Sequence, residues 1–208
     1  NGDRWTNSVL FAAEALFPAD YPADPDIDMD GSDFAEEQIN LSIDPCTNMD
    51  VLRMYETFER NVGDVILTRA GFRDSLDTGR YGIVNHIGHG YYYTAQVGDA
   101  GFNTGDADGL NNGVDNPFMI YALNCASAGF HYSCLMERLL QNPNGGAAMA
   151  IGSVEAAFPV TSNNYQQEFF AQLYCLSEPR AGKLVALSRA PFIGNTDANY
   201  TDRWTFEN

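Results

Sequence analysis

A histidine and a cysteine in this chain each close a short apolar run, and together they could carry out covalent catalysis. His89 lies near the end of segment 83–90 (IVNHIGHG), and Cys125 ends segment 120–125 (IYALNC). Runs of this kind are typical of buried strands, and functional groups in an open α/β sheet collect where strands end. A thiol attacks as the thiolate, and a neighbouring imidazole can take its proton. The pattern predicts His89 as the base and Cys125 as the nucleophile, side by side.

Gly90, directly after the predicted base, could stabilise the negative charge that such an attack creates. A glycine has no side chain to keep a substrate away from its backbone N–H, so the N–H of Gly90 is a candidate donor to a developing oxyanion. The backbone N–H of Cys125 is the natural second donor.

His86 is the competing histidine, three residues before His89. It should lie inside the strand, as a packed or hydrogen-bonded core residue. A zinc site built from His86, His89 and either His131 or Cys134 is the alternative, because imidazole and thiolate are good zinc ligands. Residues three apart on a strand point to opposite faces, which disfavours a shared metal.

Several segments, taken in order, resemble the gingipain-like cysteine peptidases of family C25, which are relatives of the caspases. They are 5–13 (WTNSVLFAA), 81–90 (YGIVNHIGHG), 117–125 (PFMIYALNC), 134–140 (CLMERLL) and 144–153 (NGGAAMAIGS). The resemblance covers most of the chain. It implies a caspase-like fold and a cysteine endopeptidase that forms an acyl-enzyme with its protein or peptide substrate. It also implies cleavage after arginine or lysine, and a secreted or cell-surface location.

The resemblance also suggests further site residues. In the caspase-like strand order the first strand lies beside the histidine strand, so Glu14, at the end of that first strand, could orient the His89 imidazole. A carboxylate that pairs with a basic substrate side chain could come from Asp106, Asp108 or segment 152–155 (GSVE). The chain stops at 203–208 (RWTFEN), where relatives continue, so we expect part of a longer protein.

An acidic loop at 26–37 has the spacing of a calcium-binding loop. Oxygen donors stand at relative positions 1, 3, 5, 7 and 12, with glycine at position 6. This pattern predicts a structural Ca²⁺ site, although the proline-rich segment before it cannot form the usual entering helix. A plain acidic surface loop is the alternative. The predicted ligands are Asp26, Asp28, Asp30, Ser32 and Glu37. A second set in the loop after His89 is more typical of turn formers: Asp99, Asn103, Asp106, Asp108 and Asn111.

Composition limits the classes of function. The chain has 208 residues, which fits one domain with a sizeable core. Its formal net charge of −17 argues against binding nucleic acid or an anionic membrane, and favours cationic substrates and calcium. No apolar run is long enough to span a bilayer. There are four cysteines, so at most one disulfide can form if Cys125 is the nucleophile.

Strands are predicted to alternate with helices along the chain, which indicates an α/β fold: a mostly parallel sheet with helices on both faces. The remaining predicted strands are 8–13 and 147–151, while 50–57 is ambiguous and the resemblance favours a strand there. Predicted helices are 33–40, capped by Ser32 or Asp33, then 66–76, 133–140, 166–176 and 182–192. Segments 17–32 and 91–116 are expected to be loops.

A non-catalytic function is the main alternative hypothesis. The same scaffold could serve as a calcium-binding module for interaction or adhesion. The reactivity of Cys125 discriminates between the two, because a catalytic thiol reacts quickly near neutral pH whereas a structural thiol does not.

Overall fold

A six-stranded parallel sheet forms the centre of the computed structural model, which describes residues 7–18, 28–178 and 180–192. The strand order is β3-β2-β1-β4-β8-β9, and every neighbouring pair is parallel. The strands are β1 (Ser8–Ala13), β2 (Asp50–Tyr55), β3 (Val65–Ile66), β4 (Ile83–Ile87), β8 (Phe118–Leu123) and β9 (Ala147–Ile151). The predicted fold class is confirmed, and 50–57 does contain a strand.

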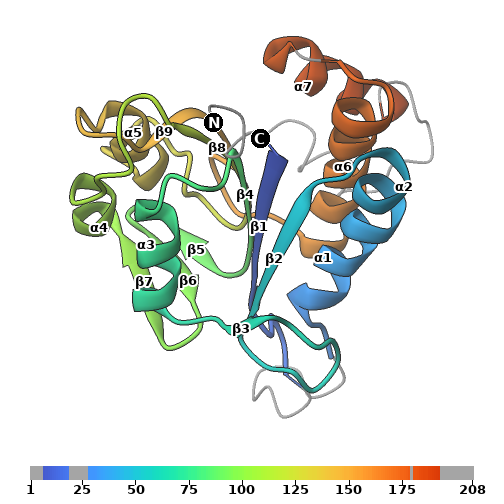
Figure 1. Cartoon of the computed structure of the whole chain (residues 1–208), viewed down its shortest axis with the longest axis horizontal. Coiled ribbons are helices and arrows are strands. Elements are labelled where there is room, and N and C mark those ends of the chain that lie inside the picture. The colour runs from blue at the N-terminus through green and yellow to red at the C-terminus, as the bar shows by residue number, and fades with distance from the viewer. Residues whose placement is uncertain (1–6, 19–27, 179, 193–208) are drawn as a thin grey trace.

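Helices cover both faces of this sheet (Figure 1). One face carries α3 (Arg69–Asp77), α4 (Thr104–Asp108) and α5 (Leu135–Gln141), and the other carries α1 (Gly31–Gln38), α2 (Asp44–Cys46), α6 (Pro159–Phe170) and α7 (Ala181–Arg189). Each face therefore has its own apolar core. Phe72, Phe102 and Leu135 belong to the first core, and Ile39, Phe169 and Phe170 to the second.

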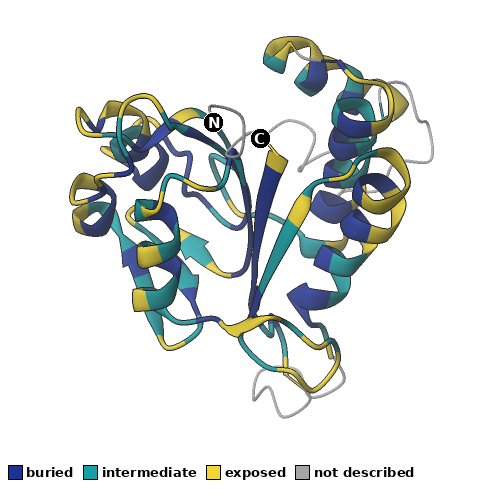
Figure 2. Cartoon of the chain, in the orientation of Figure 1, coloured by how far each residue is buried: buried dark blue, intermediate teal, exposed yellow. Residues whose placement is uncertain are grey.

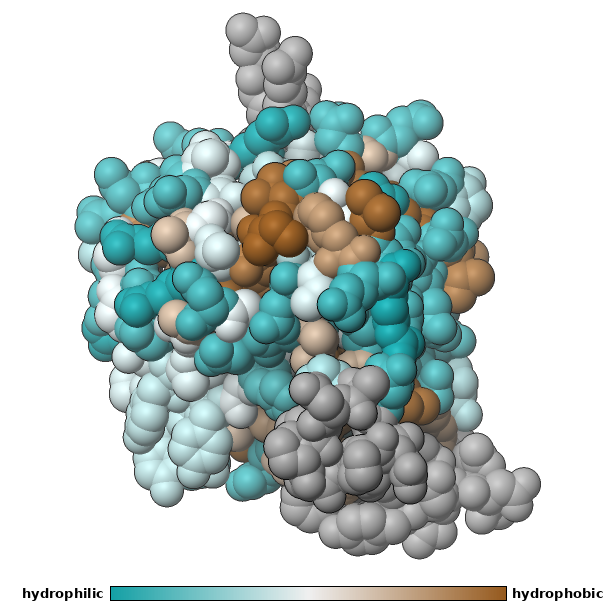
Figure 3. Space-filling model, turned by 90° about the horizontal axis from the view of Figure 1, so that it is seen from below, coloured by the Kyte–Doolittle hydropathy of each residue, from teal (hydrophilic) through white to brown (hydrophobic). Residues whose placement is uncertain are grey.

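The middle strands are apolar because they are covered from both sides. All six residues of β1 are buried, and Figure 2 shows this strand in dark blue at the centre of the molecule. In the view of Figure 1 the strands run downward, so their carboxyl ends meet at the lower edge. Seen from below, hydrophobic residues collect near the middle of the surface within a hydrophilic surround (Figure 3).

Segment 91–116 is more ordered than a loop, and here the prediction was wrong. It contains β6 (Thr94–Val97), β7 (Ala100–Asn103) and α4, and β5 (Gly90–Tyr91) completes a small antiparallel sheet in the order β5-β6-β7. Gly98, with φ of 71°, allows the tight turn between β6 and β7. Asn103 caps α4 by accepting the N–H groups of Gly105 and Asp106.

Helix boundaries also differ from the predictions in ways that capping explains. Helix α1 begins at Gly31 because Asp30, rather than Ser32 or Asp33, is its cap, with Asp30 Oδ1 accepting the Ser32 N–H at 2.8 Å. Predicted helix 66–76 is split: Val65–Ile66 is an edge strand, and α3 starts after its cap Thr68.

A disulfide joins Cys46 to Cys175, which are 129 residues apart in the chain. It links the end of α2 to the π-helical turn Ala171–Cys175 that continues α6. Cys125 and Cys134 are free. Across the residues that the structure describes, no helix has both the length and the apolar character needed to cross a membrane.

Candidate active site

His89 and Cys125 emerge from neighbouring strands at the same edge of the sheet. Strands β4 and β8 are paired in parallel, and their last paired residues are Ile87 and Leu123. His89 and Cys125 each lie two residues beyond these positions, and the N–H of Gly88 donates to the Leu123 carbonyl at 3.1 Å between them. The strand register therefore places the two residues that the sequence singled out just past the ends of adjacent strands, at one edge of the sheet.

The His89 side chain is exposed, and one of its ring nitrogens is already engaged. Its Nε2 atom lies 2.8 Å from the carbonyl oxygen of Leu16, and the ring of Phe17 packs edge-on against the imidazole at 5.6 Å between centroids. A carbonyl can only accept, so Nε2 carries the proton. In the neutral ring Nδ1 then holds the free lone pair, as a general base requires.

The Cys125 side chain is half-buried and contacts the main chain of Ala157. Its Sγ atom lies 3.4 Å from the Ala157 nitrogen and 3.8 Å from the Ala157 carbonyl oxygen. The N–H can donate to a thiolate, and the carbonyl can accept from a thiol. Ala126 has φ of 56°, an unfavourable value for a non-glycine residue, and its N–H donates to the Glu155 carbonyl at 2.8 Å. The loop after β9 thus holds the turn that carries the thiol.

Glu14 lies at the site, but it does not contact the imidazole as expected. Its carboxylate accepts the main-chain N–H of His89 at 2.8 Å and that of Gly98 at 3.2 Å. The ring is held by the Leu16 carbonyl instead, because Glu14 is buried beneath the loop. Burial, with a smaller contribution from Glu56, raises the pKa of Glu14 from 4.5 to about 7, although its two backbone hydrogen bonds act in the opposite direction.

Gly90 is a glycine for a reason that the sequence did not reveal. A Cβ atom at this position would lie only 2.7 Å from Cγ of Asn124. The Gln96 N–H donates to the His89 carbonyl at 2.9 Å, so His89 faces β6 in the antiparallel hairpin. The next residue, Gly90, must then direct its N–H and C=O away from β6. That orientation leaves the Gly90 N–H on the open edge of β5.

His86 is a hydrogen-bonded core residue, as predicted. It is buried, and its Nε2 atom lies 2.7 Å from the Gln96 carbonyl oxygen. Burial lowers the pKa of His86 from 6.5 to about 4, so the ring is neutral near pH 7. Among the described residues no group of three or more His, Cys, Asp or Glu side chains could hold a metal ion. The zinc alternative therefore has no site within them.

The predicted calcium ligands do not converge. Asp28 forms an ion pair with Arg60, Asp30 caps α1, and Ser32 Oγ accepts from Asn61 at 3.0 Å. Glu37 lies within α1 and accepts from two side chains of α6, Asn163 at 2.6 Å and Gln167 at 2.8 Å. Asp26 lies outside the described residues. Because a helix begins at Gly31, the described donors of this set do not wrap round one ion.

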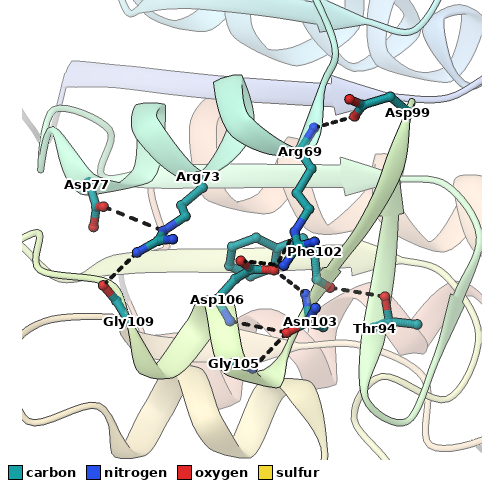
Figure 4. Close-up of polar contacts among 10 residues, drawn as sticks. All are labelled: Arg69, Arg73, Asp77, Thr94, Asp99, Phe102, Asn103, Gly105, Asp106 and Gly109. Atoms are coloured by element: carbon teal, nitrogen blue, oxygen red, sulfur yellow. Dashed lines mark hydrogen bonds and ion pairs between the residues drawn. The ribbon is translucent and has the colours of Figure 1, made fainter.

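Two of the three proposed sources of a substrate-binding carboxylate are already paired. Asp106 receives two hydrogen bonds from the Arg69 guanidinium, both at 2.9 Å (Figure 4), and Asp108 receives two from Arg138. Asp106 and Asp108, in the loop after His89, thus form structural ion pairs. Glu155 differs: its side chain is half-buried, and no described residue forms an ion pair with it.

A cavity of about 80 Å³ adjoins Cys125 between the sheet and helices α6 and α7. Asn124 precedes Cys125 in the sequence, and Ala157 contacts its Sγ atom. Both residues line the cavity, together with Leu123, Ser153 and Arg189. Among the described residues, no carboxylate lines this cavity. A basic side chain bound here would have to find its carboxylate nearby, and Glu155 is two residues from Ala157.

The fold, with a histidine and a cysteine just past the ends of adjacent strands, defines a caspase-like α/β protein with a candidate thiol active site. The chain belongs to peptidase family C25, whose model matches residues 1–207. No curated protein sequence matches it.

Solved structures with the same fold include gingipains. One is the Arg-specific cysteine proteinase gingipain R (RgpB), with a TM-score of 0.70 and 19% identity over 90% of this chain and 42% of that one. A complex of the pro- and mature domains of RgpB from Porphyromonas gingivalis has a TM-score of 0.69 and 18% identity, over 90% and 43%. A structure described only as a protease has a TM-score of 0.71 and 16% identity, over 99% and 46%. The chain spans less than half the length of these solved chains.

Sequence reasoning missed the main-chain partners of the site. The Leu16 carbonyl and the Ala157 N–H are backbone groups, so no residue type marks them. Asn124 and Ser127 could have been noticed from the sequence, because both are polar residues close to Cys125 in an apolar segment. Both are buried in the structure, as residues with a structural role near the site would be.

Proposed function

We propose that this chain is the catalytic part of a cysteine endopeptidase that cleaves peptide bonds after arginine or lysine. The observation that carries the proposal is the position of His89 and Cys125, two residues past paired ends of adjacent parallel strands. Membership of peptidase family C25 supports the same reaction class.

In this proposal His89 generates the nucleophile. The Leu16 carbonyl keeps the proton on Nε2, so Nδ1 accepts the proton of Cys125. The Ala157 N–H, 3.4 Å from Sγ, stabilises the resulting thiolate. Glu14 acts on the base indirectly, by holding the main chain of His89 in place.

The thiolate then attacks the scissile carbonyl carbon and forms a tetrahedral intermediate. The N–H groups of Gly90 and Cys125 are the proposed donors to its oxyanion, and the outward orientation of Gly90 supports this role. The intermediate collapses to an acyl-enzyme as the amine leaves with the proton from His89. Water, activated by His89, releases the acid product and restores the thiol.

Preference for a basic residue rests on Glu155. Its carboxylate is free of ion pairs among the described residues, and its main chain is bonded to Ala126, directly after the nucleophile. Desolvation chiefly, and then the charge of Glu155, raise the pKa of Tyr92. A carboxylate without an ion-pair partner can bind a guanidinium or an ammonium group. Gingipain R, which has the same fold, is an Arg-specific cysteine proteinase, and this agrees with the preference.

Kinetics on matched peptides test the proposal. Substrates that differ only in the residue before the scissile bond, with arginine, lysine, aspartate or leucine there, are compared for kcat/KM. We expect cleavage of the arginine and lysine peptides, and loss of turnover in Cys125→Ala and His89→Ala. Cleavage of the leucine peptide instead would assign specificity to the apolar cavity. Full activity of Cys125→Ala would overturn the mechanism.

A secreted or cell-surface location is part of the same proposal. The disulfide between Cys46 and Cys175 supports it, because disulfides persist in oxidising compartments. Mass analysis of the protein purified from its source, with and without reductant, tests whether this bond is formed in the natural setting.

A further inference from the structure

A chain of hydrogen bonds runs beneath the candidate active site and joins three elements. Asn124 Nδ2 lies 3.3 Å from Nδ1 of His86, and Ser127 Oγ donates to Asn124 Oδ1 at 2.6 Å. At the other end, Nε2 of His86 lies 2.7 Å from the Gln96 carbonyl. His86, Asn124 and Ser127 are each at most 2% exposed, so these bonds are sheltered from water.

The Gln96 carbonyl fixes the donor and the acceptor of every hydrogen bond in this network. The Gln96 carbonyl can only accept, so His86 Nε2 is protonated. The neutral ring must then accept at Nδ1, which requires the amide nitrogen of Asn124 to face it. The oxygen of Asn124 is left to accept from Ser127. This network has one favoured arrangement, because a flip of the Asn124 amide would make its oxygen face the accepting Nδ1 of His86.

This network touches the backbone of each residue of the candidate site. Asn124 immediately precedes Cys125, and its side chain lies where a Cβ of Gly90 would be. Gln96 holds both histidines, since its carbonyl accepts from His86 and its N–H donates to the His89 carbonyl at 2.9 Å. Asn124 is thus packed against Gly90 and joined to Cys125 by a peptide bond, and the main chain of Gln96 links His86 to His89.

We propose that His86 is a positioning residue: through Asn124 and Gln96 it sets the geometry of Cys125 and Gly90 relative to His89. It touches no reacting atom. The inference rests on the proposed function for its kinetic consequences, whereas its hydrogen-bond pattern can be tested in the resting protein.

Two substitutions at His86 separate positioning from packing. Gln can donate to Gln96 and accept from Asn124, so His86→Gln keeps the polarity of the network, whereas His86→Leu removes both bonds. We expect His86→Leu to lower kcat by about 10- to 100-fold with KM changed by less than about threefold, because positioning acts in the transition state. His86→Gln should recover most of the lost kcat.

A matched control is Asn142→Asp, away from the site. Asn142 is buried and donates two hydrogen bonds, to the carbonyls of Ala107 and Leu110. The Asn142→Asp variant should have a lower midpoint of thermal unfolding, as we expect for His86→Leu. Its kcat should be unchanged at temperatures where the protein is folded. Equal kcat in His86→Leu and the wild type, or equal losses in His86→Gln and His86→Leu, would overturn the proposal.

Nitrogen NMR of the ¹⁵N-labelled wild type tests the network without any substrate. The groups that face His86 are His89, Glu14 across Gly88, and the ring of Phe72. We expect the His86 ring to stay neutral, with the proton on Nε2, from pH 8 down to about pH 5, since burial lowers its pKa to about 4. Protonation above pH 6, or a proton on Nδ1, would contradict the network.

Asn124→Asp gives an independent spectroscopic check. A carboxylate in place of the amide cannot donate to Nδ1, so His86 should gain a proton and titrate at a higher pH than in the wild type. A His86 titration unchanged from the wild type would contradict the hydrogen bond between Asn124 and Nδ1 of His86. If the wild type cleaves no peptide, the proposed function fails, but the two NMR results still decide whether His86 and Asn124 are coupled.

Discussion

The Oε2 atom of Glu14 accepts the main-chain N–H of His89 at 2.8 Å, which ties the end of β1 to the loop that carries the candidate base. Burial raises the pKa of Glu14 from 4.5 to about 7. The folded protein then binds this proton more tightly than the unfolded chain does, so the contribution to stability is present below pH 4.5 and is lost as the pH rises through 7.

We therefore expect the stability of the wild type to fall relative to Glu14→Gln between pH 5 and pH 8, by up to about 3 kcal/mol. Urea unfolding of both proteins across this range measures the difference. The opposite contribution of His86, whose lowered pKa makes stability rise between about pH 4 and 6.5, is common to both proteins and cancels.

Glu59→Gln is the control for that titration, because Glu59 is exposed. It accounts for the loss of one surface negative charge, and its stability difference from the wild type is subtracted at each pH. A corrected difference for Glu14→Gln that stays flat would show that the Glu14 carboxyl titrates in the folded protein as it does in the unfolded chain.

The sequence was sufficient to place His89 and Cys125 just past the ends of adjacent strands, because apolar runs reveal buried parallel strands and parallel strands bring their ends to one edge. It was also sufficient for the layered fold. It was insufficient for segment 91–116, where glycines and polar residues suggested a loop. Ala95, Val97 and Phe102 in that segment belong to the same apolar core as Phe72 of α3, a tertiary contact that no local pattern contains.

Two further differences between the expected and the observed contacts share one cause. The ring of His89 bonds a main-chain carbonyl, so Glu14 was assigned a contact that Leu16 makes. The acidic loop has the spacing of a calcium site, but Asp30 is used as a helix cap. In both cases the residue type was informative, and its partner depended on the fold.

Asp106 and Glu155 should behave in opposite ways when neutralised. Asp106→Asn leaves the Arg69 guanidinium without its carboxylate, so we expect a loss of about 1–3 kcal/mol in the free energy of unfolding. Its preference for arginine over leucine peptides should not change. Glu155→Gln should change stability by less than about 0.5 kcal/mol and should weaken that preference. A larger loss of preference in Asp106→Asn than in Glu155→Gln would reject Glu155 as the specificity residue.

The disulfide between Cys46 and Cys175 closes a loop of 129 residues. In the chain-entropy model a loop this long should contribute about 4–5 kcal/mol to stability. We expect the double variant Cys46→Ser/Cys175→Ser to unfold at lower urea concentration, and the reduced wild type to match it. Coincident unfolding of the oxidised and reduced wild type would show that the bond contributes nothing.

Calcium should have little effect through the predicted loop, because Asp28, Asp30 and Glu37 already have protein partners. We expect the midpoint of thermal unfolding in millimolar CaCl₂ to match that in EDTA, with MgCl₂ as the control for ionic strength. Stabilisation by calcium that Asp30→Asn abolishes would restore the calcium prediction.

Covalent labelling of the thiol tests the central claim most directly. The protein is treated at neutral pH with an arginyl chloromethyl ketone, and the adduct is located by mass spectrometry, with Cys125→Ala and an aspartyl probe as controls. Cys134 is a free but fully buried cysteine, so it reports on non-specific alkylation. The account predicts one adduct, on Cys125, with the basic probe. No adduct in the folded protein, or equal labelling of Cys125 and Cys134, would contradict it.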